Sequence, residues 1–440
     1  MSGLPDQYFD LGHYHLKITA NSPVAQTWFN GGLIWAYYFN HDEAAACFIR
    51  AREEDPSCAM AFWGNRTLVA LITTNRGLVQ PIERSLIEAI ITRFPAPGTI
   101  PQDFGVFDNV YASAMQTVAT TYGKDPDVLA LFADSLMCKR PRRLWDLEKG
   151  YPATADTTEA QMVLEAALNR PGGINYPALT HLYAHLMEGS FFPEKALHAA
   201  DRLRSPVPHG SHVQHMATHI DLACGDYRLA IDSNRKAMAA DDLYFQCQIG
   251  SPMYTVYRAH NIPALAYSAM MADCSKDAVI AGRRLSKIIT PVLLSVKSPP
   301  MDDWAEYLHG TLAHVLVRFG RWEEILRNPL PENPELMPIT TAAYPYARGL
   351  AFAALGRVPE ARYEKAKMEA VLGEIPAERQ YGLNCPAHRV LGKARFCIEK
   401  NGLTRPFAVF VMPWQQKTTY PTLIHRSEYS LLDTRSELYS

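Results

Sequence analysis

A helix–turn–helix pattern near the start of the chain, repeated further on, restricts the fold more than any other feature. In residues 25–56, Trp28, Gly32 and Trp35 share one helical face, and the small Gly32 lets a second helix approach closely. That second helix ends at Pro56, because proline cannot continue a helix. One such pair cannot bury its own apolar face, so the pattern predicts a stack of similar pairs.

The pattern returns with decreasing clarity along the chain. Gly225, Gly320 and Gly356 each lie in a short turn between two helix-like segments, and alternating patterns typical of strands are scarce. A large residue, a glycine, an aromatic residue, an alanine and a proline follow one another over about 34 residues. This order and spacing are similar to those of the tetratricopeptide repeat. We therefore predict an all-α, tetratricopeptide-like helical-repeat solenoid, a right-handed superhelix of helix pairs. Residues 1–401 are expected to form this single domain, and residues 402–440 an irregular C-terminal cap or tail.

Composition excludes several classes of protein. Of the 440 residues, 48% are hydrophobic, and 43 basic residues nearly balance 45 acidic ones, which argues against a nucleic-acid binder. No apolar run approaches the length of a membrane span, and the first residues lack an apolar signal core. The eight cysteines contain no CxxC pair. We expect a cytoplasmic protein with neither a nucleic-acid nor a membrane partner.

Two histidine-rich segments are expected to carry the chemistry. Their sequences are His181-Leu-Tyr-Ala-His185-Leu-Met-Glu188 and His212-Val-Gln-His215-Met-Ala-Thr-His219. Residues three or four apart share a helical face, so each segment predicts one polar stripe. The two stripes are in register, because 34 residues separate His181 from His215 and His185 from His219. Units of this period would start at Pro177 and Ser211 and would bring the imidazoles together in the groove of the solenoid.

Clustered imidazoles favour a metal site. Neutral histidine is the commonest nitrogen ligand for zinc, copper, iron and nickel, and two histidines four apart on a helix can chelate one ion. We predict a transition metal, with copper or iron favoured and zinc possible. The predicted ligands are His181, His185, His212, His215, His219 and His260. A metal-free polar or acid–base groove and simple packing are the alternatives.

Two other residues receive predicted roles in the same groove. Glu188 completes the first histidine stripe, where a carboxylate serves either as a metal ligand or as a general base. Tyr37 belongs to an aromatic run that mainly packs helices, but its ring is placed to line a site for an organic molecule.

The same segments resemble a known family. Residues 28–64 and both histidine motifs are similar to bacterial and fungal tetratricopeptide-repeat proteins with HxxxHxxE and HxxHxxxH motifs, and the similarity extends over roughly residues 10–375. This chain departs from the family pattern by one inserted residue, Ser211, between Gly210 and His212. The resemblance implies the repeat fold and no particular activity.

The leading hypothesis is a metal-dependent oxidoreductase of the oxygenase or oxidase type, acting on a small organic molecule in the concave groove. A zinc-dependent hydrolase is the close variant. The alternative from another class is a non-enzymatic adaptor that grips a partner peptide in the groove. Adaptor grooves for acidic peptide termini need Lys, Arg and Asn at the positions that histidine occupies here, which favours the enzyme.

Overall fold

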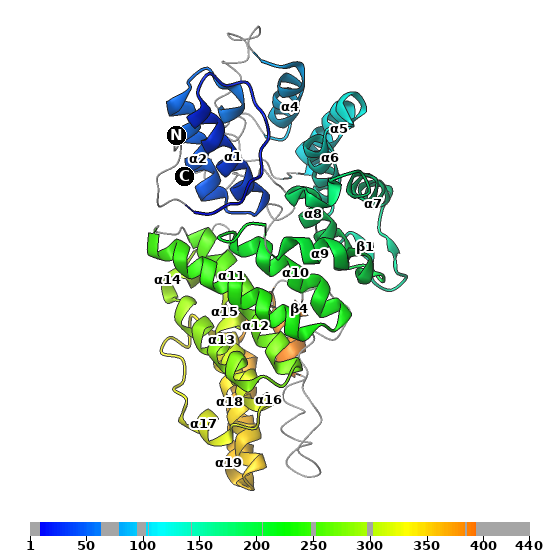
Figure 1. The fold of residues 1–440 in the computed structure, drawn as a ribbon. Coiled ribbons are helices and arrows are strands. Elements are labelled where there is room, and N and C mark those ends of the chain that lie inside the picture. The colour runs from blue at the N-terminus through cyan, green and yellow to red at the C-terminus, as the bar shows by residue number, and fades with distance from the viewer. Residues whose placement is uncertain are drawn as a thin grey trace. The chain divides into compact units, whose positions relative to one another are not determined.

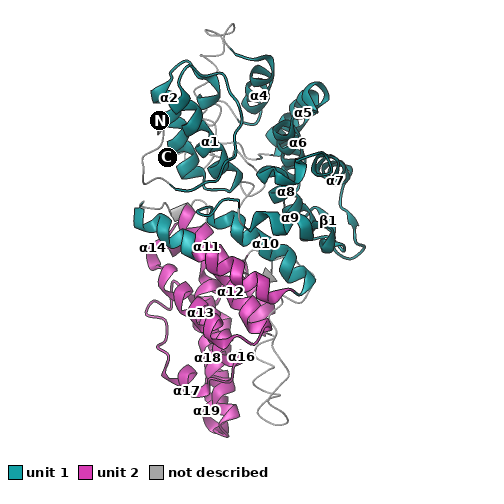
Figure 2. Ribbon diagram, viewed as in Figure 1, with its two compact units in different colours: residues 1–225, 239–249, 424–440 teal, residues 226–238, 250–423 magenta. Residues whose placement is uncertain are grey.

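A computed structural model of the chain describes residues 9–62, 79–94, 103, 105–141, 143–204, 206–247, 252–296, 302–382 and 385–392. Within these ranges the protein is all-α apart from two short hairpins, which confirms the predicted fold class (Figure 1). The chain forms two compact units (Figure 2). Unit 1 comprises residues 1–225, 239–249 and 424–440, and unit 2 comprises residues 226–238 and 250–423. The predicted boundary at residue 401 lies outside the described residues, so that the single repeat domain and its tail stay predictions.

Unit 1 is built from helices that pack against their neighbours in sequence. Its described helices of seven or more residues are α1 (Pro23–Tyr37), α2 (His41–Glu54), α4 (Pro81–Ile91), α5 (Gly105–Tyr122), α6 (Pro126–Cys138), α7 (Ala155–Leu168), α8 (Pro177–Met187), α9 (Leu197–Leu203) and α10 (Ser211–Cys224). Short 3₁₀ turns are η1 (Ala59–Phe62), η3 (Gly173–Asn175) and η4 (Pro193–Ala196). Helix α1 packs on α2, and α6 packs on both α5 and α7. Helices α8, α9 and α10 pack on one another.

Unit 2 repeats this pairing. Its described elements are α12 (Pro252–Met271), α13 (Ser275–Ile288), α14 (Pro291–Leu294), α15 (Asp302–His309), α16 (Thr311–Arg318), α17 (Trp322–Arg327), α18 (Pro338–Ala354), α19 (Val358–Glu374) and the hairpin of β3 (Gln380–Tyr381) and β4 (Cys385–Pro386). Helix α12 packs on α13, and α18 packs on α19. Helix α11 (Tyr227–Cys247) contributes its first residues to unit 2 and its last residues to unit 1.

The predicted glycine turns are present. Gly225, Gly320 and Gly356 all have positive φ, the left-handed conformation that ends a helix at little cost only for glycine. The sequence prediction missed two hairpins, β3–β4 and that of β1 (Trp145–Asp146) and β2 (Tyr151–Pro152), because strands of two residues are too short to show an alternating pattern.

Helices α1 and α2 approach closely at Gly32, as predicted. A Cβ at Gly32 would lie 2.7 Å from the ring of Phe48 on α2, whereas a Cβ at the neighbouring Gly31 would meet only ordinary contacts at 3.7 and 3.8 Å. The two adjacent glycines of α1 therefore play different roles. Gly32 permits the packing of the pair, and Gly31 has room for a methyl group.

This difference gives a matched prediction. Gly32→Ala should lower the free energy of unfolding by about 1–3 kcal/mol, because it overpacks the α1–α2 interface. Gly31→Ala should raise the free energy of unfolding by up to about 1 kcal/mol, because alanine is the better helix former. Urea unfolding of both variants followed by circular dichroism checks the pair. Equal effects of the two substitutions would contradict the close approach at Gly32.

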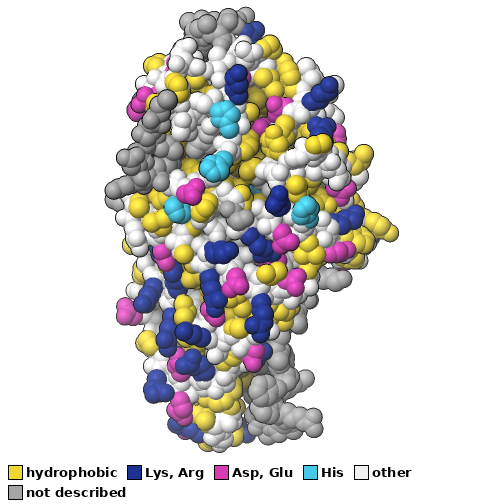
Figure 3. All heavy atoms as spheres, viewed as in Figure 1, with side chains coloured by type: hydrophobic (Ala, Val, Ile, Leu, Met, Phe, Trp, Pro, Cys, Tyr) yellow, Lys and Arg dark blue, Asp and Glu magenta, His cyan; other side chains and the backbone are white. Residues whose placement is uncertain are grey.

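Two further properties of the structure agree with the composition. Basic and acidic side chains intermingle on the face drawn in Figure 3. Among the described residues, none of the helices combines the length and apolar character required to cross a membrane. The predicted cytoplasmic location stays a prediction.

Candidate metal centre

Helices α8 and α10 start where the 34-residue period places them, at Pro177 and Ser211. Proline suits the first turn of α8, where its missing N–H has no helical partner to lose. Helix α10 ends at Gly225, whose φ is 88°. The inserted Ser211 is thus the first residue of α10, and His212 is the second.

The structure brings three predicted ligands together as a triad. One ligand atom each from His181, His185 and His212 lies within 4.8 Å of the others. The ring centroids are 4.8 Å apart for His181 and His185 and 5.1 Å apart for His181 and His212. Because α8 supplies two of these rings and α10 the third, the triad depends on the packing of the two helices against each other.

The other two predicted ligands of α10 form an adjoining pair. The Nε2 atoms of His215 and His219, one helical turn apart, are hydrogen-bonded to each other at 2.9 Å. The pair lies beside the triad, since the ring centroids are 5.8 Å apart for His185 and His219 and 5.9 Å apart for His212 and His215. Five predicted ligands therefore form one cluster in unit 1.

Glu188 joins the triad to the pair. It caps the C-terminus of α8, and its Oε1 lies 3.1 Å from Nδ1 of His185, while its Oε2 contacts Nδ1 of His219. Burial alone would raise the pKa of Glu188, but its electrostatic interaction with His219 and the hydrogen bonds from both imidazoles outweigh the effect of burial and lower the pKa to about 2. The ionised carboxylate accepts hydrogen bonds from both Nδ1–H groups, which leaves the lone pairs on Nε2.

His181 is oriented by the backbone instead. Its Nδ1 lies 2.7 Å from the carbonyl oxygen of Tyr37 and must donate to it, so the Nε2 atom carries the lone pair. That Nε2 is buried and has no hydrogen-bond partner among the residues that the structure describes. Burial, aided by neighbouring His185, lowers the pKa of His181 well below its usual range, and burial also lowers the pKa of His185. An unsatisfied buried acceptor on a neutral ring is costly without a ligand.

The cluster is buried and does not line an open groove, which corrects the predicted surroundings. The five imidazoles are between 0 and 5% exposed. The reason is the turn between α1 and α2, because the ring of Phe39 lies 4.9 Å from His181, 4.9 Å from His212 and 5.7 Å from His185. Phe39 has a φ of 62°, a conformation that a bulky residue adopts only where the surroundings enforce it.

Tyr37 is anchored by a second buried network. Its hydroxyl donates to Oδ1 of Asp127 on α6 at 2.6 Å, and Tyr14 donates to the same oxygen. Its carbonyl, as noted, accepts from His181. The side chain is fully buried, so its predicted contact with a substrate stays a prediction. Sequence reasoning missed the Asp127 network, because its members are about 100 residues apart.

Asp127 makes stability depend on pH in a definite direction. Burial raises the pKa of Asp127 to about 6 from an ordinary 3.8, although both tyrosine hydrogen bonds oppose the shift. The folded protein therefore binds a proton that the unfolded chain has lost between those pH values, and stability falls as pH rises through this range.

Asp127→Asn should remove that contribution. The melting temperature of the variant minus that of the parent should rise as pH increases from about 4 to 6, because only the parent has a carboxyl group to ionise there. Thermal unfolding of both proteins over this range checks the prediction. A difference that does not change with pH would contradict the assignment to Asp127.

The sixth predicted ligand lies in the other unit. His260 is on α12 of unit 2, where it is 5% exposed, and its role stays a prediction. His314, also in unit 2, has its Nε2 3.0 Å from the hydroxyl of Tyr381.

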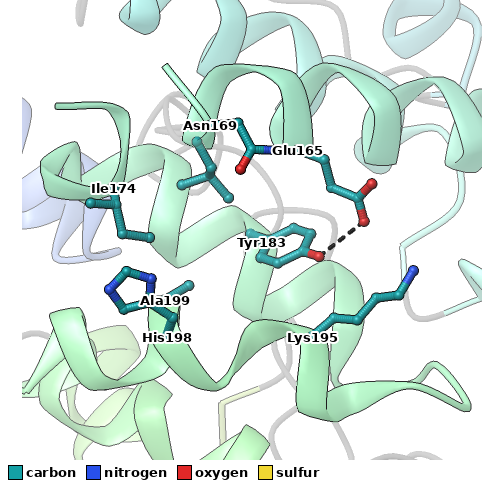
Figure 4. Close-up of a pocket in the computed structure, with 8 residues that line it drawn as sticks. Glu165, Asn169, Ile174, Tyr183, Lys195, His198 and Ala199 are labelled. Carbon is teal, nitrogen blue, oxygen red and sulfur yellow. Dashed lines mark hydrogen bonds between the residues drawn. The ribbon is translucent and has the colours of Figure 1, made fainter. Parts of the chain in front are cut away.

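A cavity of about 510 Å³ is lined in part by α8 (Figure 4). Its lining includes Tyr183, whose hydroxyl donates to Glu165 at 3.0 Å, together with Lys195 and His198. Tyr183 is two residues from both His181 and His185, and two residues along a helix point in nearly opposite directions. The cavity is therefore separated from the imidazoles by α8.

Comparisons with known proteins identify no family. No protein-family model matches the chain, and no curated protein matches it. A solved structure that is similar bears the description "Crystal Structure of P58(IPK) TPR Domain at 2.5 A". It shares 12% identity, and the match covers 87% of this chain and 99% of that chain with a TM-score of 0.20. A TM-score this low carries no argument, so membership of the histidine-rich family stays a prediction.

Proposed function

We propose that the protein is a transition-metal enzyme whose metal is bound by His181, His185, His212, His215 and His219. The observation that carries the proposal is the buried cluster itself, in which the Nε2 atom of His181 has no hydrogen-bond partner within the described part of the chain and one carboxylate orients two other rings. A buried, unsatisfied nitrogen such as Nε2 of His181 is costly in the absence of an ion and favourable in its presence.

The donor set favours copper or iron. All five side chains offer imidazole nitrogen, which suits copper, iron, nickel and zinc, whereas magnesium and calcium prefer oxygen. Neutral rings bind a metal without adding charge, so the buried carboxylate of Glu188 is left to balance the charge of the cation. Copper or iron, when bound, would supply one-electron chemistry, and we infer oxidation of a small organic molecule with dioxygen as the electron acceptor.

The protein's own residues would prepare the site. Glu188 would hold His185 and His219 in the Nε2 tautomer, and the Tyr37 carbonyl would do the same for His181. Phe39 would keep bulk water away from the rings. Both carboxylate oxygens of Glu188 already contact imidazole, which favours a positioning role over the predicted roles of direct ligand or general base.

A redox test separates this function from its alternatives. Metal-free protein without an affinity tag would be loaded with Cu(II), reduced with ascorbate, freed of excess reductant and exposed to air. We expect the Cu(II) absorption and electron paramagnetic resonance signals to return, and the His198→Ala variant, changed at an exposed histidine, to behave like the parent. Bound copper that stays reduced in air would contradict the proposed redox role.

Two other outcomes would point elsewhere. Ester hydrolysis by the zinc-loaded protein, with no reaction of the reduced copper protein in air, would favour the zinc-dependent hydrolase. Failure to bind any transition metal would favour a helical-repeat adaptor that grips a partner peptide, since that role needs no metal.

A further inference from the structure

The cluster offers more nitrogen ligands than one ion in a protein usually takes. Zinc is held by four ligands in structural sites and by three in catalytic sites, and blue copper has two histidines and a cysteine. Here five imidazoles of unit 1 adjoin one another. Glu188 does not add to the surplus, because its oxygens are occupied by Nδ1 atoms.

The imidazoles divide into two groups by distance. The triad of His181, His185 and His212 places a ligand atom of each residue within 4.8 Å of the others. Ligands about 2.0–2.1 Å from one ion are at most about 4.2 Å apart, so small ring rotations would close the triad around an ion.

The pair of His215 and His219 has a different geometry. Its Nε2 atoms are 2.9 Å apart and share a hydrogen bond, in which one ring donates to the other. Two nitrogens about 2.05 Å from one ion are about 2.9–3.3 Å apart, so an ion that replaces the shared proton would require only small rotations of the two rings. The i, i+4 spacing on α10 makes this pair a chelate by itself.

We propose that the cluster binds two neighbouring metal ions, one at the triad and one at the pair. Glu188 orients one ligand of each, since it contacts His185 of the triad and His219 of the pair. The pair supplies only two nitrogens from unit 1 and so leaves positions at its ion for further ligands. This inference rests on the proposed metal function and specifies the number and arrangement of the ions.

The test is a copper titration of the metal-free, full-length protein without a tag, followed by equilibrium dialysis. The parent should bind two Cu(II) ions. His181→Asn keeps a donor for the Tyr37 carbonyl but removes Nε2, so this variant should bind one ion. His219→Asn should also bind one ion, and His198→Ala, changed outside the cluster, should bind two.

Magnetic coupling gives an independent readout. Two neighbouring Cu(II) ions in the parent should show less electron paramagnetic resonance intensity than their copper content, whereas each one-ion variant should show full intensity. His212→Ala replaces His181→Asn if circular dichroism shows that the latter is unfolded.

The outcomes are distinguishable. One ion in the parent that is lost from either variant would overturn the two-ion centre and leave the proposed metal function intact. If the parent binds no copper, both the two-ion centre and the proposed metal function are overturned. If both variants still bind two uncoupled ions, the copper lies elsewhere in the protein. This result would also overturn the two-ion centre and the proposed metal function.

Discussion

His185→Asn should abolish metal binding at the triad while the helices remain folded. Asparagine still donates to Glu188 but lacks the Nε2 atom of the imidazole. Loss of a residue that hydrogen-bonds to a metal ligand and orients it typically weakens metal binding by about 10–100-fold. Loss of the ligand itself should therefore weaken metal binding by more than about 100-fold. Competition with a chromophoric chelator measures the affinity, and far-ultraviolet circular dichroism reports helix content.

The matched control is His314→Asn, which removes another buried imidazole. His314 contacts Tyr381 in unit 2, so its replacement should leave metal affinity unchanged even if it lowers the melting temperature. If His185→Asn binds metal as tightly as the parent, the cluster is a packing feature.

Glu188→Gln should weaken metal binding by about 10–100-fold without removing a ligand. The glutamine oxygen accepts from one imidazole, but its amide group then faces the Nδ1–H of the other. That ring must move its proton to Nε2, the atom needed for the metal. The substitution also removes the buried negative charge that balances the bound cation.

The size of this effect separates three roles for Glu188. A positioning role predicts the intermediate loss, a direct ligand predicts a loss like that of His185→Asn, and a general base predicts normal affinity with slow turnover. Glu165→Gln is the control, because Glu165 accepts from Tyr183 on the opposite side of α8. Unchanged affinity in both variants would contradict the positioning role.

The sequence predicts local parts of this site well. Period and helical spacing were sufficient to place the starts of α8 and α10 and to put His181 and His185 on one face, because these properties depend on residues within one or two helical turns. The 34-residue register also anticipates that the two stripes meet.

Properties that depend on distant residues escape such reasoning. Phe39 covers the imidazoles although about 140 residues separate it from His181, and no local pattern records that contact. The same holds for the hydrogen bond between Tyr37 and His181 and for the two tyrosines on Asp127. Burial of the cluster therefore had to come from the structure, and the predicted open groove was wrong for these side chains.

Elemental analysis of the purified protein shows whether the histidine cluster holds a transition metal. The protein should be produced without a metal-affinity tag in medium containing copper, iron and zinc, and then analysed by inductively coupled plasma mass spectrometry. We predict at least one equivalent of copper or iron per chain, absent from a variant that combines His185→Asn with His219→Asn. Only traces of every transition metal in the parent, with none taken up on incubation with the three ions, would contradict the account.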